Sequence, residues 1–122
     1  MFFPVAEWFA AFVLTLAVEA PIVAILLRPS AVEPVRVAVA FVIVNLATHL
    51  TVWYVLTQLI LYDTPAFALV AEGWAIAAET IYYAAIFRTI SARRAFLIAA
   101  VANLTSFVVG RALFTLSAPL IS

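Results

Sequence analysis

The sequence predicts an all-α integral membrane protein, folded as a bundle of four transmembrane helices. Hydrophobic residues make up 69% of the 122 residues and charged residues only 10%, a composition that a soluble domain of this size cannot cover with polar surface. The apolar residues also form four runs, each long enough for the about 20 residues that a helix needs to cross a bilayer. These runs cover residues 5–27, 37–61, 66–87 and 95–117.

Short breaking segments separate the four runs. Two prolines lie in segment 28–34, a proline follows Asp63 and Thr64, and segment 88–94 is a polar loop. Proline and small polar residues are typical of turns and helix starts. Helices joined by loops this short must run up and down, which predicts two antiparallel hairpins in one bundle. The expected hairpins cover residues 5–61 and 66–117 of a single transmembrane domain, 1–122.

The arginines predict the orientation in the membrane. All six basic residues are arginines, and five of them flank the first and third connections. They are Arg28, Arg36, Arg88, Arg93 and Arg94. Because positive charges mark the cytoplasmic side of membrane helices, we expect both termini and the Asp63 turn on the outer side of the cytoplasmic membrane of a prokaryote. The first run has no basic segment before it, so we expect an uncleaved first span.

The two predicted hairpins resemble each other in sequence. Segment 17–28 aligns with segment 77–88 through matched alanine, glutamate and arginine residues. In the second helices, Asn45 and Asn103 follow an arginine at the same distance. The glutamate and asparagine matches are informative because spanning a bilayer does not require them. Since each unit has two helices, the repeat predicts a pseudo-twofold axis along the membrane normal.

The repeat predicts one polar side chain from each helix at a common depth. At about 1.5 Å per residue, these side chains lie about 12–14 Å from the cytoplasmic helix ends. They are Glu19, Asn45, Glu79 and Asn103. His49, Thr48 and Ser106 extend this layer on the same helix faces. Pro21 cannot donate to the carbonyl of Ala17, so a free backbone oxygen is expected near Glu19.

A second polar layer is expected toward the outer face. Glu72 lies two helical turns before Glu79 on the same stripe of its helix. Glu7 and Arg111 lie within about two turns of the outer ends of their helices. Arg111 can pair with either Glu72 or Glu7, or extend outward to the membrane surface. If Glu72 is unpaired, the two glutamates of this helix mark a path from the outside to the inner layer.

Two interpretations of the inner layer stay open. In a structural role each glutamate is neutral and hydrogen-bonded to an asparagine. The glutamate must be neutral because a buried ionised carboxylate costs about 2.5–3.5 kcal/mol, whereas an intramembrane hydrogen bond contributes only about 0.6–2 kcal/mol. In a functional role the same groups bind a cation or relay protons. Carboxyl, amide and hydroxyl oxygens suit hard cations better than zinc or copper. In the functional interpretation His49 is a ligand of the cation. In the structural interpretation it donates a hydrogen bond to another helix.

The composition excludes several kinds of chemistry. The chain has no cysteine and one histidine, so it can form no thiolate metal site, no covalently attached haem and no two-histidine haem site by itself. The identity of any cofactor or metal stays unknown. Nothing in the charge pattern indicates nucleic-acid binding, since positive and negative residues balance. The expected surroundings are the lipid bilayer and either further copies of the chain or other membrane subunits.

Three functions remain as hypotheses. The favoured one is an intramembrane carboxylate and amide site that binds or translocates a cation or protons. The alternative is an accessory subunit of a respiratory, photosynthetic or transport complex. The third is an intramembrane enzyme that acts on a lipid or isoprenoid, with a glutamate as acid or base and His49 assisting.

Overall fold

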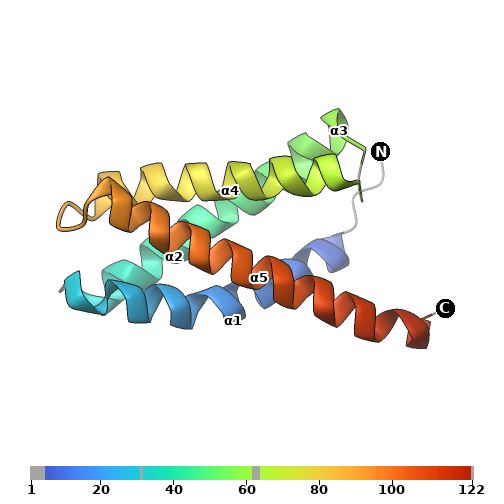
Figure 1. Cartoon of the computed structure of the whole chain (residues 1–122), viewed down its shortest axis with the longest axis horizontal. Helices are drawn as coiled ribbons and strands as arrows, with labels where there is room; N and C mark the ends of the chain where they lie inside the picture. The colour runs from blue at the N-terminus through green and yellow to red at the C-terminus, as the bar shows by residue number, and fades with distance from the viewer. Residues whose placement is uncertain (1–4, 31, 62–63, 122) are drawn as a thin grey trace.

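The described part of the chain forms four helical rods that run up and down (Figure 1). The computed structural model describes residues 5–30, 32–61 and 64–121, and for 5–8, 30 and 114–121 it describes the backbone only. The second rod is continuous but contains a π-helical turn. The elements are α1 (Val5–Leu27), a 3-10 turn (Arg28–Ser30), α2 (Pro34–Thr51), the π-helical segment η2 (Val52–Leu56), α3 (Thr57–Leu59), α4 (Pro65–Ile86) and α5 (Ala92–Ile121). The all-helical fold predicted from the sequence is confirmed.

Local turn chemistry explains where the helices begin. Pro34 and Pro65 occupy the first turns of α2 and α4, where the missing proline N–H costs no helical hydrogen bond. The Thr64 hydroxyl accepts a hydrogen bond from the Phe67 backbone N–H at 3.2 Å. The Ser91 hydroxyl accepts one from the Arg94 backbone N–H at 3.1 Å. These bonds satisfy N–H groups that the first turns of α4 and α5 leave without helical partners.

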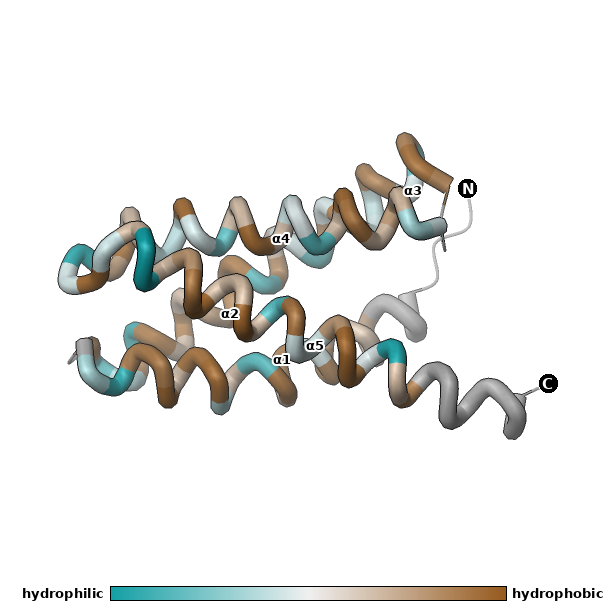
Figure 2. Tube along the Cα trace, viewed as in Figure 1, coloured by the Kyte–Doolittle hydropathy of each residue, from teal (hydrophilic) through white to brown (hydrophobic). Residues whose placement is uncertain are grey.

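Within the described residues, three helical stretches are long and apolar enough to cross a membrane: Phe9–Leu27, Pro34–Leu59 and Ala92–Leu113. The expectation of four apolar spans is therefore confirmed for three. The fourth helix, α4, has a comparable length of 22 residues, but Glu72 and Glu79 lower its mean hydropathy. In Figure 2 hydrophobic residues dominate the tube, and a group of hydrophilic ones lies where α4 turns into α5.

The four rods pack as a ring that is tight at one end. α1 packs against α2 and α5, and α4 packs against the same two helices. We call the end with Arg28–Ser30 and the 87–91 loop the arginine-loop end. The half of the bundle next to it holds the main apolar core, which includes Val23, Leu27, Phe41, Val44, Tyr83, Phe87 and Ile98. Toward the opposite end, where α4 begins, α5 diverges from α4 (Figure 1).

Two arginine bonds join the hairpins at the arginine-loop end. Arg36 Nη2 donates to the carbonyl of Ile86 at 3.1 Å, and Arg94 Nη2 donates to the carbonyl of Leu26 at 2.8 Å. Both carbonyls lie in the last turn of a helix, where the helix itself provides no N–H donor for them. A positive charge at this end also interacts favourably with the helix dipole. Each bond runs from the second helix of one hairpin to the first helix of the other.

We predict that Arg36→Ala and Arg94→Ala each lower the free energy of unfolding by about 1 kcal/mol, because each removes one hydrogen bond between the hairpins. Arg93→Ala is the matched control, since Arg93 is an exposed arginine in the first turn of α5. Denaturant titration of the protein in detergent micelles measures the three differences. Equal effects of Arg93→Ala and Arg94→Ala would show that these bonds do not hold the hairpins together.

Candidate functional site

All four residues of the predicted inner layer lie in the interior of the bundle. Glu19 and Glu79 are 0% exposed, Asn45 is 1% exposed and Asn103 is 4% exposed. On their helices the two glutamates lie one turn before core residues, Val23 in α1 and Tyr83 in α4. The polar layer therefore begins directly where the apolar core ends.

The two glutamates have different hydrogen-bond donors. Asn103 Nδ2 donates to Glu79 Oε2 at 3.0 Å, which is the glutamate–asparagine bond expected from the sequence. Glu19 Oε2 instead accepts from the Ser106 hydroxyl at 2.6 Å, because α1 packs along α5. Asn45 Nδ2 donates to the carbonyl of Phe41 in its own helix at 3.0 Å. The expectation that each glutamate bonds an asparagine is thus correct for one of the two.

Several oxygen atoms in this region are buried and unsatisfied. Glu19 Oε1, Glu79 Oε1, Asn45 Oδ1 and the Tyr83 hydroxyl have no hydrogen-bond partner among the residues that the structure describes. Leaving a buried polar atom without a partner costs about 1–3 kcal/mol, and more when the atom is charged. For the two glutamates, a proton on the carboxyl group or a cation bound beside it removes the additional cost of a buried charge.

An inner cavity of about 140 Å³ lies beside Glu19. Since a water molecule occupies about 30 Å³ in the liquid, the cavity has room for a few water molecules or one small cation with part of its hydration shell. Its polar lining comes from every rod of the bundle. The lining residues with polar or aromatic side chains are Thr15, Glu19, Thr48, His49, Trp53, Glu72, Asn103, Ser106 and Phe107.

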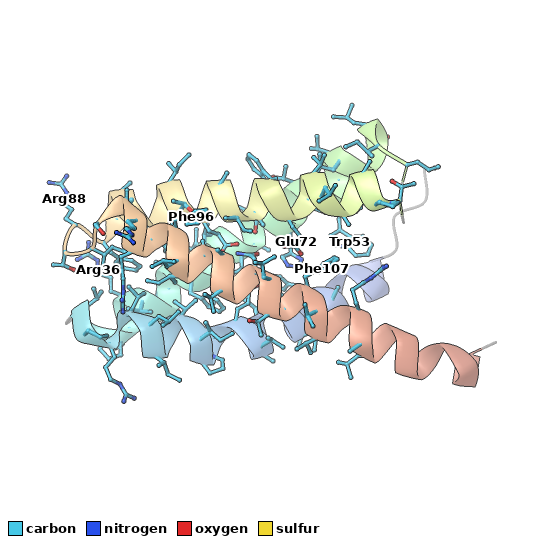
Figure 3. The ribbon with its side chains drawn as sticks, viewed as in Figure 1. Arg36, Trp53, Glu72, Arg88, Phe96 and Phe107 are labelled. Atoms are coloured by element: carbon cyan, nitrogen blue, oxygen red, sulfur yellow. The ribbon has the colours of Figure 1, made fainter. Side chains whose placement is uncertain are left out.

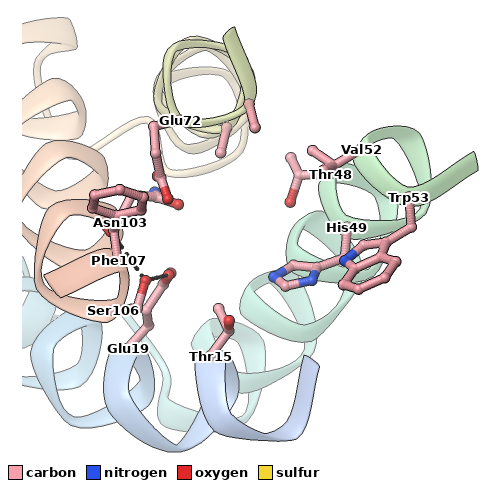
Figure 4. Close-up of a pocket in the computed structure, with 12 residues that line it drawn as sticks. Thr15, Glu19, Thr48, His49, Val52, Trp53, Glu72, Asn103, Ser106 and Phe107 are labelled. Atoms are coloured by element: carbon pink, nitrogen blue, oxygen red, sulfur yellow. Dashed lines mark hydrogen bonds between the residues drawn. The ribbon is translucent and has the colours of Figure 1, made fainter. Parts of the chain in front are cut away.

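His49 faces this cavity from α2 (Figure 4). Its ring packs edge-on against Phe12 with 5.4 Å between the ring centroids. The buried Nδ1 atom has no hydrogen-bond partner in the described part of the chain. Figure 4 shows the His49 and Trp53 rings on one side of the cavity, with Glu72 and the bonded Glu19–Ser106 pair across from them. His49 is therefore placed where its ring can form a hydrogen bond with a molecule in the cavity.

The sequence reasoning missed the π-helical segment that follows His49. Val52 and Trp53 belong to this segment and line the inner cavity. π-helical turns inside α-helices occur frequently at functional sites. Trp53 follows His49 by four residues, a spacing that places both side chains on one helix face, so this spacing was the available signal in the sequence.

An end pocket of about 470 Å³ lies next to the inner cavity, on the side of the bundle where α4 begins. Ala71, Glu72 and Phe107 line both spaces. Figure 3 shows Glu72, Phe107 and Trp53 far from Arg36 and Arg88. The end pocket is also lined by Arg111, whose guanidinium carbon lies 5.9 Å from the centroid of the Phe107 ring.

The predicted outer layer is therefore partly assembled. Glu72 and Arg111 line the same end pocket, and Glu72 also reaches the inner cavity. The backbone of Glu7 lies in the first turn of α1, but its side chain is outside the part that the structure describes. Glu72 thus belongs to both predicted layers, since it contacts the space beside Glu19 as well as the space beside Arg111.

The expectation of a free backbone oxygen beside Glu19 stays a prediction. Ala17 and Pro21 are exposed, whereas Glu19 is buried. Because residues two positions apart point to nearly opposite sides of a helix, the side chains of Ala17 and Pro21 face away from that of Glu19.

Among the residues that the structure describes, no group of three or more His, Cys, Asp or Glu side chains is arranged to hold a metal ion. No protein-family model, curated protein or solved structure matches the chain.

We predict that Ser106→Ala lowers the free energy of unfolding by about 1–3 kcal/mol, because it leaves a second oxygen of the buried Glu19 carboxyl unsatisfied. Thr105→Ala is the control, since the Thr105 hydroxyl bonds only the carbonyl of Val101 in its own helix; its effect should stay within about 0.5 kcal/mol. Thermal and denaturant unfolding in detergent measure both variants. A Ser106→Ala protein as stable as Thr105→Ala would contradict a structural role for the Glu19–Ser106 bond.

Proposed function

We propose that the chain spans a membrane with all four rods and uses Glu19, Glu79, Glu72 and His49 as a site that binds protons or a small cation. The observation that carries this proposal is the Glu19 carboxyl group. It is fully buried, one oxygen accepts from Ser106, and the side chain lines the inner cavity. A buried acid beside a water-sized polar cavity is arranged to take up and release a positive charge.

The positions of the polar residues support a membrane location. Three stretches within the described residues are apolar enough to cross a bilayer, and in α4 Glu79 is buried and Glu72 half-buried, so this helix can turn both carboxyl groups away from lipid. Five of the six arginines flank the first and third connections. We therefore propose that the arginine-loop end faces the cytoplasm and the end pocket faces outward.

The sequence repeat also has support from packing. The two arginine bonds, from Arg36 to Ile86 and from Arg94 to Leu26, connect positions that are equivalent in the repeat. Where two core residues align in the sequences of the two hairpins, both are buried. These pairs are Val23 and Tyr83, Leu27 and Phe87, Ala40 and Ile98, Phe41 and Ala99, and Val44 and Ala102. Both observations agree with a pseudo-twofold axis that relates the two hairpins.

The balance of energies favours exchange of a proton for a cation. An ionised carboxylate at membrane depth costs about 2.5–3.5 kcal/mol, and a hydrogen bond such as that from Ser106 returns only about 0.6–2 kcal/mol. Glu19 in the empty site is therefore protonated. A cation that enters the cavity displaces this proton and leaves the net charge of the site unchanged, so that neither state carries an uncompensated charge.

The two ends of the bundle give this exchange a direction. The end pocket extends the inner cavity through Ala71, Glu72 and Phe107, whereas the apolar core fills the bundle on the arginine-loop side. Protons or cations therefore reach the site from the outer side. Passage to the cytoplasm requires separation of the core around Tyr83 and Phe87.

One observation favours the alternative of an accessory subunit. A groove of about 690 Å³ between α1 and α2 is lined mainly by apolar residues, among them Leu16, Val23 and Phe41. Such a groove fits a helix of another subunit as well as lipid chains. Purification from the native membrane distinguishes the two functions, because an accessory subunit copurifies with its complex in fixed proportion.

We predict that Glu19→Gln abolishes, and Glu79→Gln reduces, the release of protons when sodium, potassium or ammonium is added to the purified protein. Glutamine keeps the shape and the hydrogen-bond acceptor but carries no exchangeable acidic proton. Glu33→Gln is the control, because Glu33 is an exposed residue before α2. A pH electrode in weakly buffered detergent solution measures the release. Unchanged release in folded Glu19→Gln protein would refute the proposed site.

A further inference from the structure

The aromatic walls of the inner cavity are not explained by a site for protons or inorganic ions. Such ions need oxygen ligands or water, and Glu19, Thr48 and Ser106 supply oxygens. Trp53 and Phe107 also line this cavity, from η2 and α5. Aromatic rings add little for a hydrated inorganic ion, but they attract an organic cation through the negative face of the ring.

The site widens from an inner cavity with two carboxyl groups to a larger end pocket, which has several apolar walls besides Thr64 and Arg111. The inner cavity of about 140 Å³ has two carboxyl groups, Glu19 and Glu72. The end pocket of about 470 Å³ adds Pro65, Phe67 and Ala68 to the shared wall. Small-molecule sites of about 300–1,000 Å³ are typically apolar with a few well-placed polar groups. The two spaces together therefore fit a molecule with a charged head and an apolar body.

One aromatic ring already carries a cation. The guanidinium carbon of Arg111 lies 5.9 Å from the centroid of the Phe107 ring, within the range of a cation–π contact. The same ring lines the inner cavity. Phe107 thus stands between a resident positive charge in the end pocket and a cavity that contains two carboxyl groups.

We propose that the ligand of this site is a protonated amine with a single positive charge and an aromatic or aliphatic body. This inference rests on the proposed function, since Glu19 supplies the negative charge that the ammonium group meets. The ammonium group lies in the inner cavity among Glu19, Glu72 and His49, and the apolar body extends past Phe107 into the end pocket. A second positive charge on the body is disfavoured, because that part of the ligand lies beside Arg111.

The inference is tested by calorimetric titration of the full-length protein in detergent with phenethylammonium, its neutral analogue 2-phenylethanol, and sodium. We expect phenethylammonium to bind at least about 10-fold more tightly than the other two, because only it combines the charge with an aromatic body. Phe107→Leu and Trp53→Leu should each weaken its binding by about 2- to 30-fold.

Phe96→Leu is the matched control, because Phe96 lies on the same helix as Phe107 but is 51% exposed; it should bind the amine like the unmodified protein. Circular dichroism and thermal unfolding verify that each variant is folded, and Trp53→Leu keeps the test decisive if Phe107→Leu unfolds.

Each contrary result overturns a different claim. If 2-phenylethanol binds as tightly as phenethylammonium, the pocket recognises no charge and the inference is wrong. If phenethylammonium binds no more tightly than sodium, or if the two aromatic variants do not weaken it, the inference is wrong while the proton and cation site stands. If Glu19→Gln changes neither amine binding nor proton release, both the inference and the proposed function are wrong.

Discussion

The burial of two carboxyl groups in an apolar bundle is the constraint on which the rest of the structure depends. Glu19 and Glu79 are completely shielded, and each receives one hydrogen bond from α5, through Ser106 and Asn103. These bonds are too weak to hold two negative charges in an apolar interior. The carboxyl groups must therefore be protonated or accompanied by a cation, and the polar cavity beside Glu19 is large enough for a small cation.

The packing explains why the site lies between a closed half and an open half of the bundle. Next to the arginine loops, a large side chain in one hairpin aligns in sequence with a small one in the other. Tyr83 and Val23 are such a pair, and both residues are buried. The bonds from Arg36 and Arg94 hold the ends of the hairpins together there. Farther along, α5 diverges from α4, and the space is filled by polar and aromatic side chains around a cavity. A closely packed apolar half and a half with accessible volume are combined in a chain of 122 residues.

The sequence predicts the helices well, because prolines and hydroxyl residues at their starts act locally. It also places Glu19, Asn45, Glu79 and Asn103 at a common depth, since helical rise converts residue number into depth, and the cost of polar groups in lipid predicts that they face the interior of the bundle. It does not predict Ser106 as the partner of Glu19, because that bond depends on the packing of α1 along α5. The contribution of Trp53 to the cavity likewise depends on which face of the helix turns inward, and residue spacing in one chain does not determine that face.

The central claim is that the resting site holds a protonated Glu19 that gives up its proton when a cation binds. Infrared difference spectroscopy of the protein reconstituted in lipid measures this directly, because a protonated carboxyl group has a C=O stretching band that a carboxylate lacks. We predict that adding cation removes such a band in the unmodified protein and that Glu19→Gln eliminates the change. A spectrum in which no protonated carboxyl band responds to the cation, or in which Glu19→Gln shows the same response, would contradict the claim.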